Sequence, residues 1–548
     1  MTYCKHGLGA IPQDTRSVFA RPNKSQKKFI QIESIVMEAL AEVDLSSFFT
    51  KKGQWGIHPI RVCSLLLLQA MEGLTDAQTE EAINLNVGWK YVLHLGLNAV
   101  GWDSSVLSEH RDRFDEEAAL KVFVDSILAK ANEKGLLDRS MQRMDSTFVV
   151  AHVKALNNTE LFLESVRNVL EETTEEAFDW IDSIRLEHWL KTYYLDRPFN
   201  FRIPKEEKKR TKIAEETARD GFYILDCVDA ADAKTRAVLS KLESIRTLKR
   251  VLDEHFHTEG KGKNRKSKLK KQSELAPSGE RIVSPHEPDA RVAMKRDKTI
   301  VGFRTHTSET CTPGFPNLIT HVQTEAATLN DSLSLESIVR SMAKRGLLPK
   351  KLFLDGGYVN ADIFAKLAKS LGIDFVARLA NGHSWQSKQG KGFDLSNFFI
   401  DWKKRTATCP GQARSQTWKN DGTGGANVYF SPKDCGPCPF KENCAKGKFR
   451  VLHLKAKPVY RYMAKMRTRQ NTTEFAKEYA IRAGVEGLQS QLINRHGRKT
   501  NVRTRSKVSL KLILAVASLN ISRLISWNNN RPKSTTRKGK YQLAFAAA

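Results

Sequence analysis

The chain has 548 residues, with 89 lysine and arginine residues against 61 aspartate and glutamate residues, which gives a formal net charge of +28. Hydrophobic residues make up 40% of the sequence and aromatic residues 8%, so a wholly disordered chain is excluded. At roughly 150 residues per domain, the length predicts three or four structural units. Eight cysteines are too few for a disulfide-stabilised scaffold of this size.

The excess of positive charge predicts a polyanionic partner, either a nucleic acid or an anionic membrane. A membrane anchor is disfavoured, because Lys511, Asn520 and Arg523 interrupt the most apolar window, residues 509–527, before about 20 apolar residues accumulate. A buried helix explains this window better. The N-terminal residues lack the continuous apolar core of a secretory signal. We therefore expect a cytoplasmic, nucleoid-associated protein that binds DNA and has no membrane partner.

Residues 1–136 have the apolar periodicity of helices. The predicted helices cover residues 26–49, 58–72, 75–95, 104–114 and 116–134. Short helices with tight turns in a basic protein are typical of DNA-binding modules, although a plain helical bundle has the same pattern. We expect a helical N-terminal domain that binds DNA, and the plain bundle stays open as the alternative.

After residue 137 the sequence predicts a second domain with two insertions. The predicted strands cover residues 141–153, 299–309, 318–325, 351–355 and 374–380, and the helices cover residues 331–345, 360–371, 473–494 and 510–527. Residues 157–280 form a helical, highly charged insertion that ends in a basic stretch, residues 261–271, which we expect to be a linker. Residues 381–470 form a Cys-containing insertion without a clear period.

Without the two insertions, the predicted elements after residue 137 follow the order strand, strand, strand, helix, strand, helix, strand, helix. This order is that of an RNase H-like core. We therefore expect an α/β fold with an RNase H-like catalytic core, a mixed sheet with helices, over residues 137–528. A basic C-terminal tail, residues 529–548, follows it.

Three carboxylates occupy particular positions in this order. Asp145 lies in the first strand, Asp355 ends the fourth, and Glu486 lies on the helix after the second insertion. Phosphodiester chemistry at two divalent cations about 3.5–4 Å apart needs such a set of acidic ligands. Each position alone has a plainer interpretation, since Asp145 could face solvent and Asp355, before two glycines, could only shape a turn.

The helix that carries Glu486 is more informative. Tyr479, Arg482 and Glu486 are spaced by three and four residues, which places them on one helix face. An ion pair between Arg482 and Glu486 would give the same spacing and contribute only a few tenths of a kcal/mol. Gly484 and Gly487 flank Glu486, and a glycine inside a helix costs about 1 kcal/mol relative to alanine. Either the sheet or DNA must therefore come close to this backbone.

The motif YAIRAGVEGLQSQL, residues 479–492, resembles the Tyr-x2-Arg-x3-Glu motif of DDE-type insertion-sequence transposases. MDSTFV and FLDGGY resemble the first and second aspartate segments of that family. HPIRVCSLLLLQAMEGLTDAQ and WDSSVLSEHRDRF are similar to the N-terminal helical domain of one branch, and PDARVAMKRDKTIVGFRTHTSE resembles its hairpin after the first insertion. The matches follow the family's order over roughly residues 25–527.

The resemblance implies a DNA transposase that cleaves and transfers strands. Its metal-binding triad falls on Asp145, Asp355 and Glu486, which would bind Mg²⁺ or Mn²⁺, and Tyr479 and Arg482 would contact the DNA end. Water attacks one strand at the element's end, and the freed 3′-hydroxyl then attacks a second phosphodiester. The implied partners are double-stranded DNA, as terminal inverted repeats and target, and a second copy in a homodimer on the DNA ends.

One position departs from the family. The lysine that often follows the glutamate by seven residues is replaced by Ile493, and the nearest bases lie in RHGRKTNVRTRSK, residues 495–507. We expect Arg495, Arg498 and Lys499 to contact DNA phosphates. A solvated basic loop is the alternative.

Four cysteines gather in the second insertion. Cys409, Cys435, Cys438 and Cys444 have the spacing C-x25-C-x2-C-x5-C, and the CGPC turn resembles a metal knuckle. Four thiolates could hold a structural Zn²⁺ that folds this segment. Free cysteines in a reducing cytoplasm are the alternative, and a redox role fits less well because no thioredoxin-like pattern surrounds the CGPC turn.

Two further functions stay open. A catalytically silent DNA-binding repressor derived from a transposase would have the same charge, although the presence of all three acids argues against decay. An RNase H-like nuclease without strand transfer would share the triad, and only a joined DNA product would distinguish it from a transposase.

Overall fold

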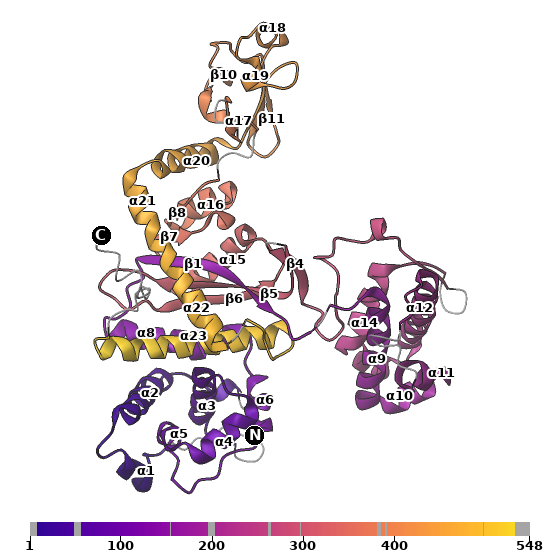
Figure 1. Ribbon diagram of the computed structural model, residues 1–548, viewed down its shortest axis with the longest axis vertical. Coiled ribbons are helices and arrows are strands. Elements are labelled where there is room, and N and C mark those ends of the chain that lie inside the picture. Colours follow the sequence, from indigo (N-terminus) through magenta and orange to yellow (C-terminus); the bar gives the residue numbers. More distant parts are fainter. Residues whose placement is uncertain are drawn as a thin grey trace, which may run out of the picture.

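A six-stranded mixed sheet lies at the centre of the computed structural model (Figure 1). The structure describes residues 8–48, 56–153, 155–195, 203–260, 265–295, 297–380, 385–388, 392–496 and 498–531. The N-terminal helices lie below the sheet in this view, a helical lobe lies beside it, and a small module with short strands lies at the opposite end from the N-terminal helices (Figure 1). The α/β class expected from the sequence is confirmed.

The sheet has the order β4-β5-β1-β7-β8, and β6 also pairs with β5. β5 is antiparallel to β1, β4 and β6, whereas β7 is parallel to β1 and β8 is parallel to β7. β4 pairs with the first residues of β5 and β6 with the later ones, so both lie along the same edge of β5. The strands are β1 (Met141–Val150), β4 (Arg291–Lys295), β5 (Lys298–Thr310), β6 (Ile319–Ala326), β7 (Lys351–Leu354) and β8 (Asp374–Ala377).

Helices cover both faces of the sheet. On one face, α15 (Asp331–Lys344) and α16 (Ala361–Leu371) pack on a core that includes Met144 and Leu354. On the other face, α22 (Val485–His496) and α23 (Arg505–Asn528) contact β1 and β6 respectively. Side chains alternate between the faces of a strand, which explains why the two-residue period in the sequence predicted these strands.

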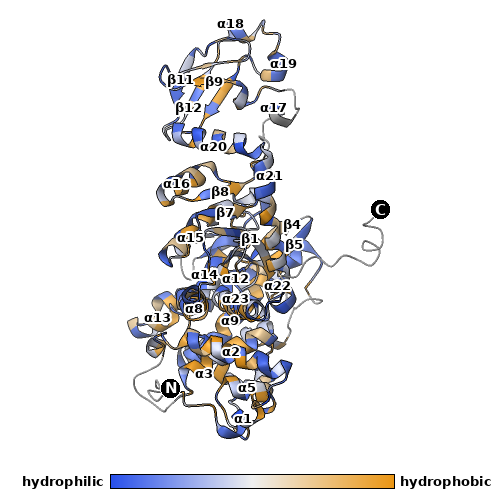
Figure 2. Ribbon diagram, turned by 90° about the vertical axis from the view of Figure 1, so that its left-hand side faces the viewer, coloured by the Kyte–Doolittle hydropathy of each residue, from blue (hydrophilic) through white to orange (hydrophobic). Residues whose placement is uncertain are grey.

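Helix α23 joins the sheet to the N-terminal helices, and Figure 2 shows it between these two layers. It is long and apolar enough to cross a membrane by length and composition, but 83% of its most apolar window is buried inside the protein. The buried helix expected from the sequence is therefore confirmed. Asn520, fully buried in this helix, accepts from Ile319 N at 2.8 Å and donates to Ile319 O at 2.9 Å. Its amide thus satisfies the backbone of the edge strand β6.

The N-terminal region is helical, as predicted, but two helix boundaries differ from the prediction. The helix expected over residues 26–49 ends at Leu40, and the one expected over residues 75–95 breaks at Asn86. Asn86 is extended, and its side chain accepts from the backbone N–H groups of Gly88 and Trp89, which starts a new helix. The helices are α1 (Gln13–Val18), α2 (Lys24–Leu40), α3 (Pro59–Glu72), α4 (Asp76–Leu85), α5 (Val87–Val92), α6 (Ser105–Arg111), α7 (Glu116–Ala119) and α8 (Ser126–Glu133).

The first insertion is a helical lobe with its own hydrophobic core. The linker expected in its basic stretch is wrong for Lys266–Leu269, which forms strand β3 and pairs with β2 (Phe256–Glu259). Residues 261–264 lie outside the described residues. The helices are α9 (Asn158–Glu176), α10 (Phe178–Ser183), α11 (His188–Leu190), α12 (Glu207–Ala230), α13 (Ala233–Leu239) and α14 (Glu243–His255).

The second insertion contains two small antiparallel sheets, and α20 (Lys457–Gln470) follows them. Strands of three or four residues are too short for a period to be recognised in the sequence. They are β9 (Phe399–Asp401), β10 (Thr406–Thr408), β11 (Thr417–Asn420), β12 (Ala426–Tyr429) and β13 (Val451–Leu454), with short helices α17 (Trp385–Lys388), α18 (Pro432–Cys435) and α19 (Lys441–Cys444). Of the basic tail expected after residue 528, residues 532–548 lie outside the described residues.

A buried carboxylate connects the sheet to its covering helices. Glu309 on β5 has a side chain only 1% exposed, and it accepts from Arg143 on β1 at 2.7 Å and from Arg523 on α23 at 2.6 Å. Arg143 also donates to Ile481 O at 3.0 Å, and Arg523 donates to the Gln491 side chain of α22 at 2.9 Å. One carboxylate thereby orients two arginines that hold the segment before α22 and α22 itself.

Replacing Glu309 tests this connection. Glu309→Ala leaves two partly buried guanidinium groups without their carboxylate, so we expect the unfolding free energy to fall by about 3–5 kcal/mol. Chemical denaturation followed by tryptophan fluorescence measures it. The matched control is Glu336→Ala, which removes a half-buried surface glutamate paired with the exposed Arg340 and Lys366 and should change stability little. Equal stabilities of the two variants would contradict the connecting role of Glu309.

Candidate active site

Two of the predicted acids, Asp145 and Asp355, lie side by side. β1 and β7 pair in parallel from Met141 with Lys351 to Arg143 with Phe353. The same register, continued by two residues, places Asp145 opposite Asp355, immediately after the last residue of β7. Because side chains alternate along strands, both point away from the face on which the preceding residues enter the core.

The electrostatics of this pair are unbalanced. The pKa of Asp145 is raised to about 6, mainly by burial and also by the negative charge of Asp355, while the Ser146 N–H and Arg482 oppose this increase. The Arg482 guanidinium lies 3.6 Å from the carboxylate of Asp145, which is an ion pair but too long for a hydrogen bond. A raised carboxyl pKa indicates that the ionised form has too little positive charge beside it. The pair therefore has the donor type and the charge that suit a divalent cation.

Asp355 also shapes the turn that follows β7. Its side chain accepts from Gly357 N at 2.7 Å and caps the 3-10 helix Gly356–Tyr358. The plainer interpretation of this aspartate, as a turn residue, is therefore correct. The turn and the position beside Asp145 coexist, because one carboxylate oxygen can accept the backbone N–H while the other stays available.

Tyr479 and Arg482 lie close to the two aspartates. The Arg482 guanidinium is 5.9 Å from the centre of the Tyr479 ring, and Arg378 lies 5.1 Å from the same ring. Burial raises the pKa of Tyr479, Arg482 lowers it, and Asp355 raises it, which places the phenol in the electrostatic range of both charges. Among the described ion pairs, Arg482 is joined to Asp145 and not to Glu486. The spacing of Tyr479, Arg482 and Glu486 therefore does not reflect a simple ion pair between Arg482 and Glu486 on the helix surface.

Glu486 lies near this pair but is not joined to it. The helix predicted over residues 473–494 is interrupted, because a 3-10 segment, Ala480–Gly484, separates α21 (Thr473–Tyr479) from α22. Glu486 is exposed in the first turn of α22. Gln489, one turn further, donates to Asp145 O at 3.4 Å and to the Thr307 hydroxyl at 2.9 Å, so this end of α22 packs beside Asp145.

The fit of these acids to a metal is therefore partial. Within the described ranges, no group of three or more His, Cys, Asp or Glu side chains is arranged to hold a metal ion. The structure brings Asp145 and Asp355 together and leaves Glu486 outside the pair. The two neighbouring carboxylates and the raised pKa of Asp145 fit a cation, and Glu486 would have to turn toward them to complete a triad.

The two glycines beside Glu486 have different surroundings. A Cβ atom on Gly484 would lie 1.8 Å from a guanidinium nitrogen of Arg143, so this position requires glycine. Nothing lies within 4 Å of the Cβ position of Gly487. The close approach expected from the sequence therefore comes, at Gly484, from a side chain of the sheet.

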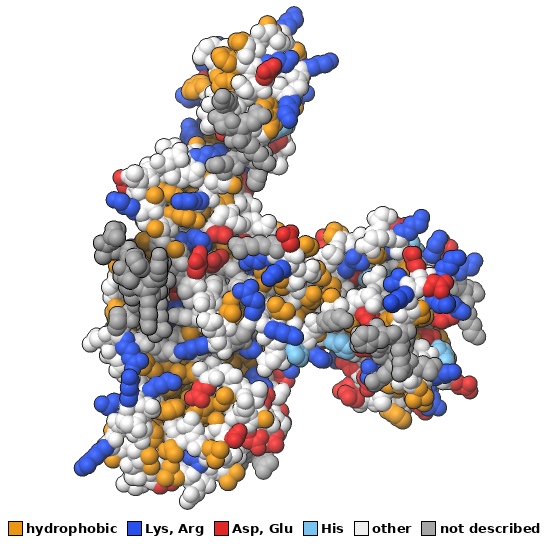
Figure 3. All heavy atoms as spheres, in the orientation of Figure 1, with side chains coloured by type: hydrophobic (Ala, Val, Ile, Leu, Met, Phe, Trp, Pro, Cys, Tyr) orange, Lys and Arg blue, Asp and Glu red, His pale blue; other side chains and the backbone are white. Residues whose placement is uncertain are grey.

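The predicted phosphate-binding bases lie in two places. Arg498 and Lys499 are exposed in a segment that bonds to the end of β1, where Val150 N donates to Arg498 O at 2.9 Å. Arg495 instead donates to the Ser522 hydroxyl of α23 at 3.1 Å and lines a cavity on the side of the N-terminal helices. Figure 3 shows lysine and arginine side chains over the sheet, the N-terminal helices and both insertions.

Several residues around the site were missed by sequence reasoning. Tyr358, fully buried, is hydrogen-bonded at 2.7 Å to His306 Nδ1 on β5, and its ordinary pKa is raised by burial and by three nearby aspartates. Asp331 is one of these, and it pairs with Arg304 at 2.7 Å. Strand and helix periodicity carried no signal for these contacts, because each joins residues far apart in the sequence.

The four cysteines approach one another in the second insertion. All are half-buried and free of disulfides. The sulfurs of Cys409 and Cys438 lie 3.7 and 3.6 Å from the Cβ position of Gly411. Burial raises the pKa of Cys444, Arg450 lowers it, and the other three thiols raise it, so all four are electrostatic neighbours. Free thiols in this arrangement have the chemistry of zinc ligands, without forming a closed ligand set.

Two family models match the chain. A model described as a transposase DDE domain matches residues 408–525, which include the cysteines, Tyr479, Arg482 and Glu486. A model described as a transposase domain (DUF772) matches residues 20–113, which include α2 to α6. Asp145 and Asp355 lie outside both matched segments. No curated protein and no solved structure matches the chain.

The contrast between the two glycines gives a direct test. Gly484→Ala forces Arg143 away from Ile481 O, so we expect a clear fall in melting temperature, measured by differential scanning fluorimetry. Gly487→Ala, in open space in the first turn of α22, should keep or raise it, because alanine favours a helix by about 1 kcal/mol over glycine. A fall of the same size in both variants would contradict the specific clash at Gly484.

Proposed function

The two matches indicate an insertion-sequence transposase of the DDE type, and from this premise we propose that the chain binds the terminal inverted repeats of its element and cleaves and transfers DNA strands. The observation that carries this proposal is the pair of neighbouring carboxylates, Asp145 and Asp355, with a raised pKa at Asp145. A cation beside the two carboxylates would relieve the penalty on the ionised form of Asp145. A divalent cation bound by Asp145 and Asp355 would serve phosphodiester cleavage.

We assign Asp145, Asp355 and Glu486 as the residues that would hold Mg²⁺ or Mn²⁺. When bound, these ions supply activation of the attacking oxygen and stabilisation of the leaving oxygen. Asp145 and Asp355 hold their ligand atoms on neighbouring strands, and Glu486 approaches from α22. Arg482, beside Asp145, would orient the phosphate of the DNA end, and Tyr479 would stack against the end nucleotide.

The topology supports an RNase H-like catalytic core. With β6 taken at its place beside β5, five strands follow the spatial order β6-β5-β1-β7-β8, in which β5 is antiparallel to β6 and β1, and β7 and β8 are parallel to β1. This matches the strand and helix order expected for that core from the sequence. The carboxylates at the neighbouring positions of β1 and β7 would then stand at the catalytic edge of the sheet.

The remaining parts of the proposal concern DNA and a second subunit. The N-terminal helices and the exposed bases Arg498 and Lys499 are assigned to DNA binding, which the net charge of +28 favours. Pairing of two element ends by a homodimer would bring both ends to one target. A joined DNA product distinguishes this function from a nuclease, and binding without cleavage would indicate a repressor.

The catalytic assignment is tested with a plasmid that carries the DNA flanking this gene. We expect purified protein to cut at the element's borders in Mg²⁺ and not in EDTA. Asp355→Asn and Asp145→Asn should lower the cleavage rate by at least about a thousandfold and keep DNA binding, because they remove ligands and not folding contacts. Gel assays of cleavage and joining, and electrophoretic mobility shifts, measure the two properties.

The matched control is Asp362→Asn, an exposed aspartate of α16 paired with Lys455 at 2.8 Å, which should cut at the rate of the original protein. Cleavage by Asp355→Asn at an undiminished rate would exclude the assigned site. Binding at the borders by every variant, with no cut under any metal condition, would favour the repressor.

We also propose that the cysteines of the second insertion bind a structural Zn²⁺. Elemental analysis of purified protein should give about one zinc per chain, as four thiolates close a tetrahedral site. Cys438→Ser should lose the metal and lower the melting temperature of the protein. Cys227→Ser, a half-buried cysteine in the first insertion, is the control and should keep the metal. Zinc-free protein that is insensitive to chelators would contradict the proposal.

A further inference from the structure

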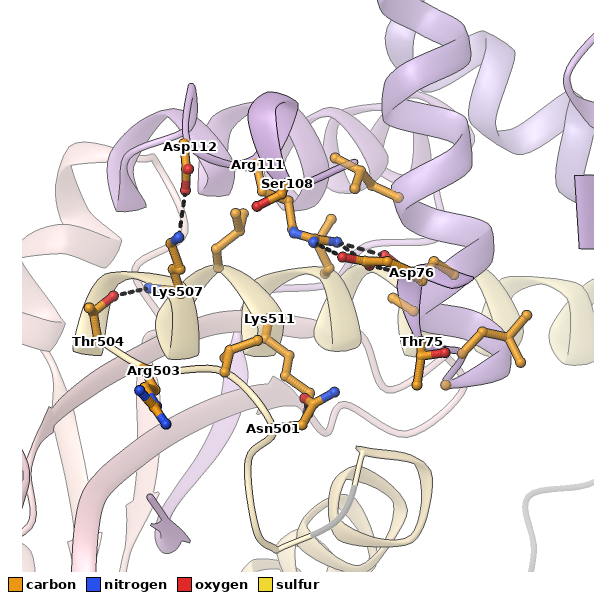
Figure 4. Close-up of a pocket in the computed structure, with 18 of the residues that line it drawn as sticks. Thr75, Asp76, Ser108, Arg111, Asp112, Asn501, Arg503, Thr504, Lys507 and Lys511 are labelled. Atoms are coloured by element: carbon orange, nitrogen blue, oxygen red, sulfur yellow. Dashed lines mark hydrogen bonds and ion pairs between the residues drawn. The ribbon is translucent and has the colours of Figure 1, made fainter. Parts of the chain in front are cut away.

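A cavity of about 520 Å³ lies between the N-terminal helices and α23, and its lining includes none of the three assigned acids. One wall consists of α3, the turn into α4, and α6. The other consists of Arg495 at the end of α22, the loop of residues 501–504 and the first turns of α23 (Figure 4). Cavities of this volume hold small-molecule groups in proteins.

The acids of this cavity are neutralised within its own walls. Asp76 accepts two hydrogen bonds from the guanidinium of Arg111, and Asp112 pairs with Lys507 at 3.2 Å. Figure 4 shows both pairs, each joining residues that line the cavity. Two of the five basic side chains in the lining are therefore already compensated.

The other three bases have no carboxylate partner. Lys511 donates to the Asn501 side chain at 2.6 Å, and Arg495 donates to the Ser522 hydroxyl, both of which are neutral acceptors. Arg503 is exposed on the loop. In the part of the chain that the structure describes, none of the three lies within ion-pair distance of an acid. The cavity thus carries three positive charges without an ion-pair partner, although Glu287 lies within electrostatic range of Arg503.

Two of these three charges, on Lys511 and Arg495, are partly desolvated, whereas the Arg503 side chain is exposed. Burial lowers the pKa of Lys511, and burial together with nearby Arg523 lowers that of Arg495. A cation in such surroundings is stabilised by an anion that replaces its lost water. The cavity also opens at the N-terminal turn of α23, where the helix dipole adds partial positive charge.

We propose that this cavity binds a phosphate of the DNA backbone through Arg495, Arg503 and Lys511. The inference rests on the proposed function, because the DNA of the element supplies the phosphate. Apolar side chains, Leu66, Leu510 and Leu514, also line the cavity and suit a sugar ring, which favours a nucleotide over a bare inorganic anion. A strand of DNA and a free nucleotide share this chemistry, and the DNA strand is the source that we assign.

The double variant Arg503→Gln, Lys511→Met tests the inference in EDTA, where cleavage plays no part. We expect its affinity for a fluorescein-labelled duplex carrying an element border to fall about tenfold, by fluorescence anisotropy. The slope of log affinity against log salt should decrease by about one, as one phosphate contact is lost. Lys511→Arg keeps the charge and should retain both values. These readouts do not depend on catalysis, so they stay informative even if the cleavage assay fails.

The matched control is Arg246→Gln, Lys249→Met, which removes two exposed bases from α14 and the same total charge. Equal affinity and salt slope in the two double variants would overturn the proposal. Phosphate ethylation interference locates the contact, since one ethylated phosphate should block the original protein and have no further effect on the cavity variant. The same interference pattern in both proteins would also overturn it.

A last experiment distinguishes a DNA strand from a free nucleotide as the source of the phosphate. Deoxyadenosine monophosphate at millimolar concentration should leave the melting temperature of the original protein unchanged, because a single nucleotide lacks the other contacts of a bound strand. Stabilisation by this nucleotide that disappears in the cavity variant, with unchanged DNA affinity, would identify a free-nucleotide site and overturn the assignment to DNA.

Discussion

The buried carboxylate of Glu309 fixes the geometry of the candidate site. A carboxylate removed from water is tolerated only when it is paired and hydrogen-bonded, and the partners here come from two different elements, Arg143 on β1 and Arg523 on α23. Each arginine uses its remaining donors on the helical segment above the sheet, at Ile481 O and at the Gln491 side chain. One buried charge therefore links α22 and the segment before it to β1 and α23.

This arrangement also explains why the two aspartates lack a strong counter-ion. Arg143 is two residues from Asp145 on the same strand and on the same face, but Glu309 and Ile481 O occupy its donors. Arg482 is left as the nearest cation, and its distance of 3.6 Å from Asp145 is too long for a hydrogen bond. Because Arg143 is committed to Glu309 and Ile481 O, the acidic pair keeps a negative charge that the cation we propose would balance.

The sequence predicts what depends on local period and misses what depends on long-range contact. The strand that carries Asp145 was predictable because of its alternating, β-branched sequence, and the strand before Asp355 because it is a short, fully buried apolar run. The break between two helices at Asn86 was not predictable, because the capping side chain of Asn86 overrides an apolar period that continues across it. The hydrogen bond between His306 and Tyr358 joins a strand to a turn far along the chain. Likewise, the register that places Asp145 beside Asp355 is set by the pairing of β1 with β7, so the local sequence did not predict it.

Helix α22 connects the proposed catalytic acids with the proposed phosphate site. Glu486 lies in its first turn and Arg495 in its last, so nine residues at about 1.5 Å each separate them by about 14 Å. Along the axis of a duplex, with one phosphate of a given strand every 3.4 Å or so, that distance corresponds to a rise of about four nucleotides. A strand bound at both ends of α22 would run along a helix that Glu309 links to α23 through Arg523. Because α23 forms one wall of the cavity and also covers the sheet, DNA held by the cavity would be placed in a fixed register relative to the acids.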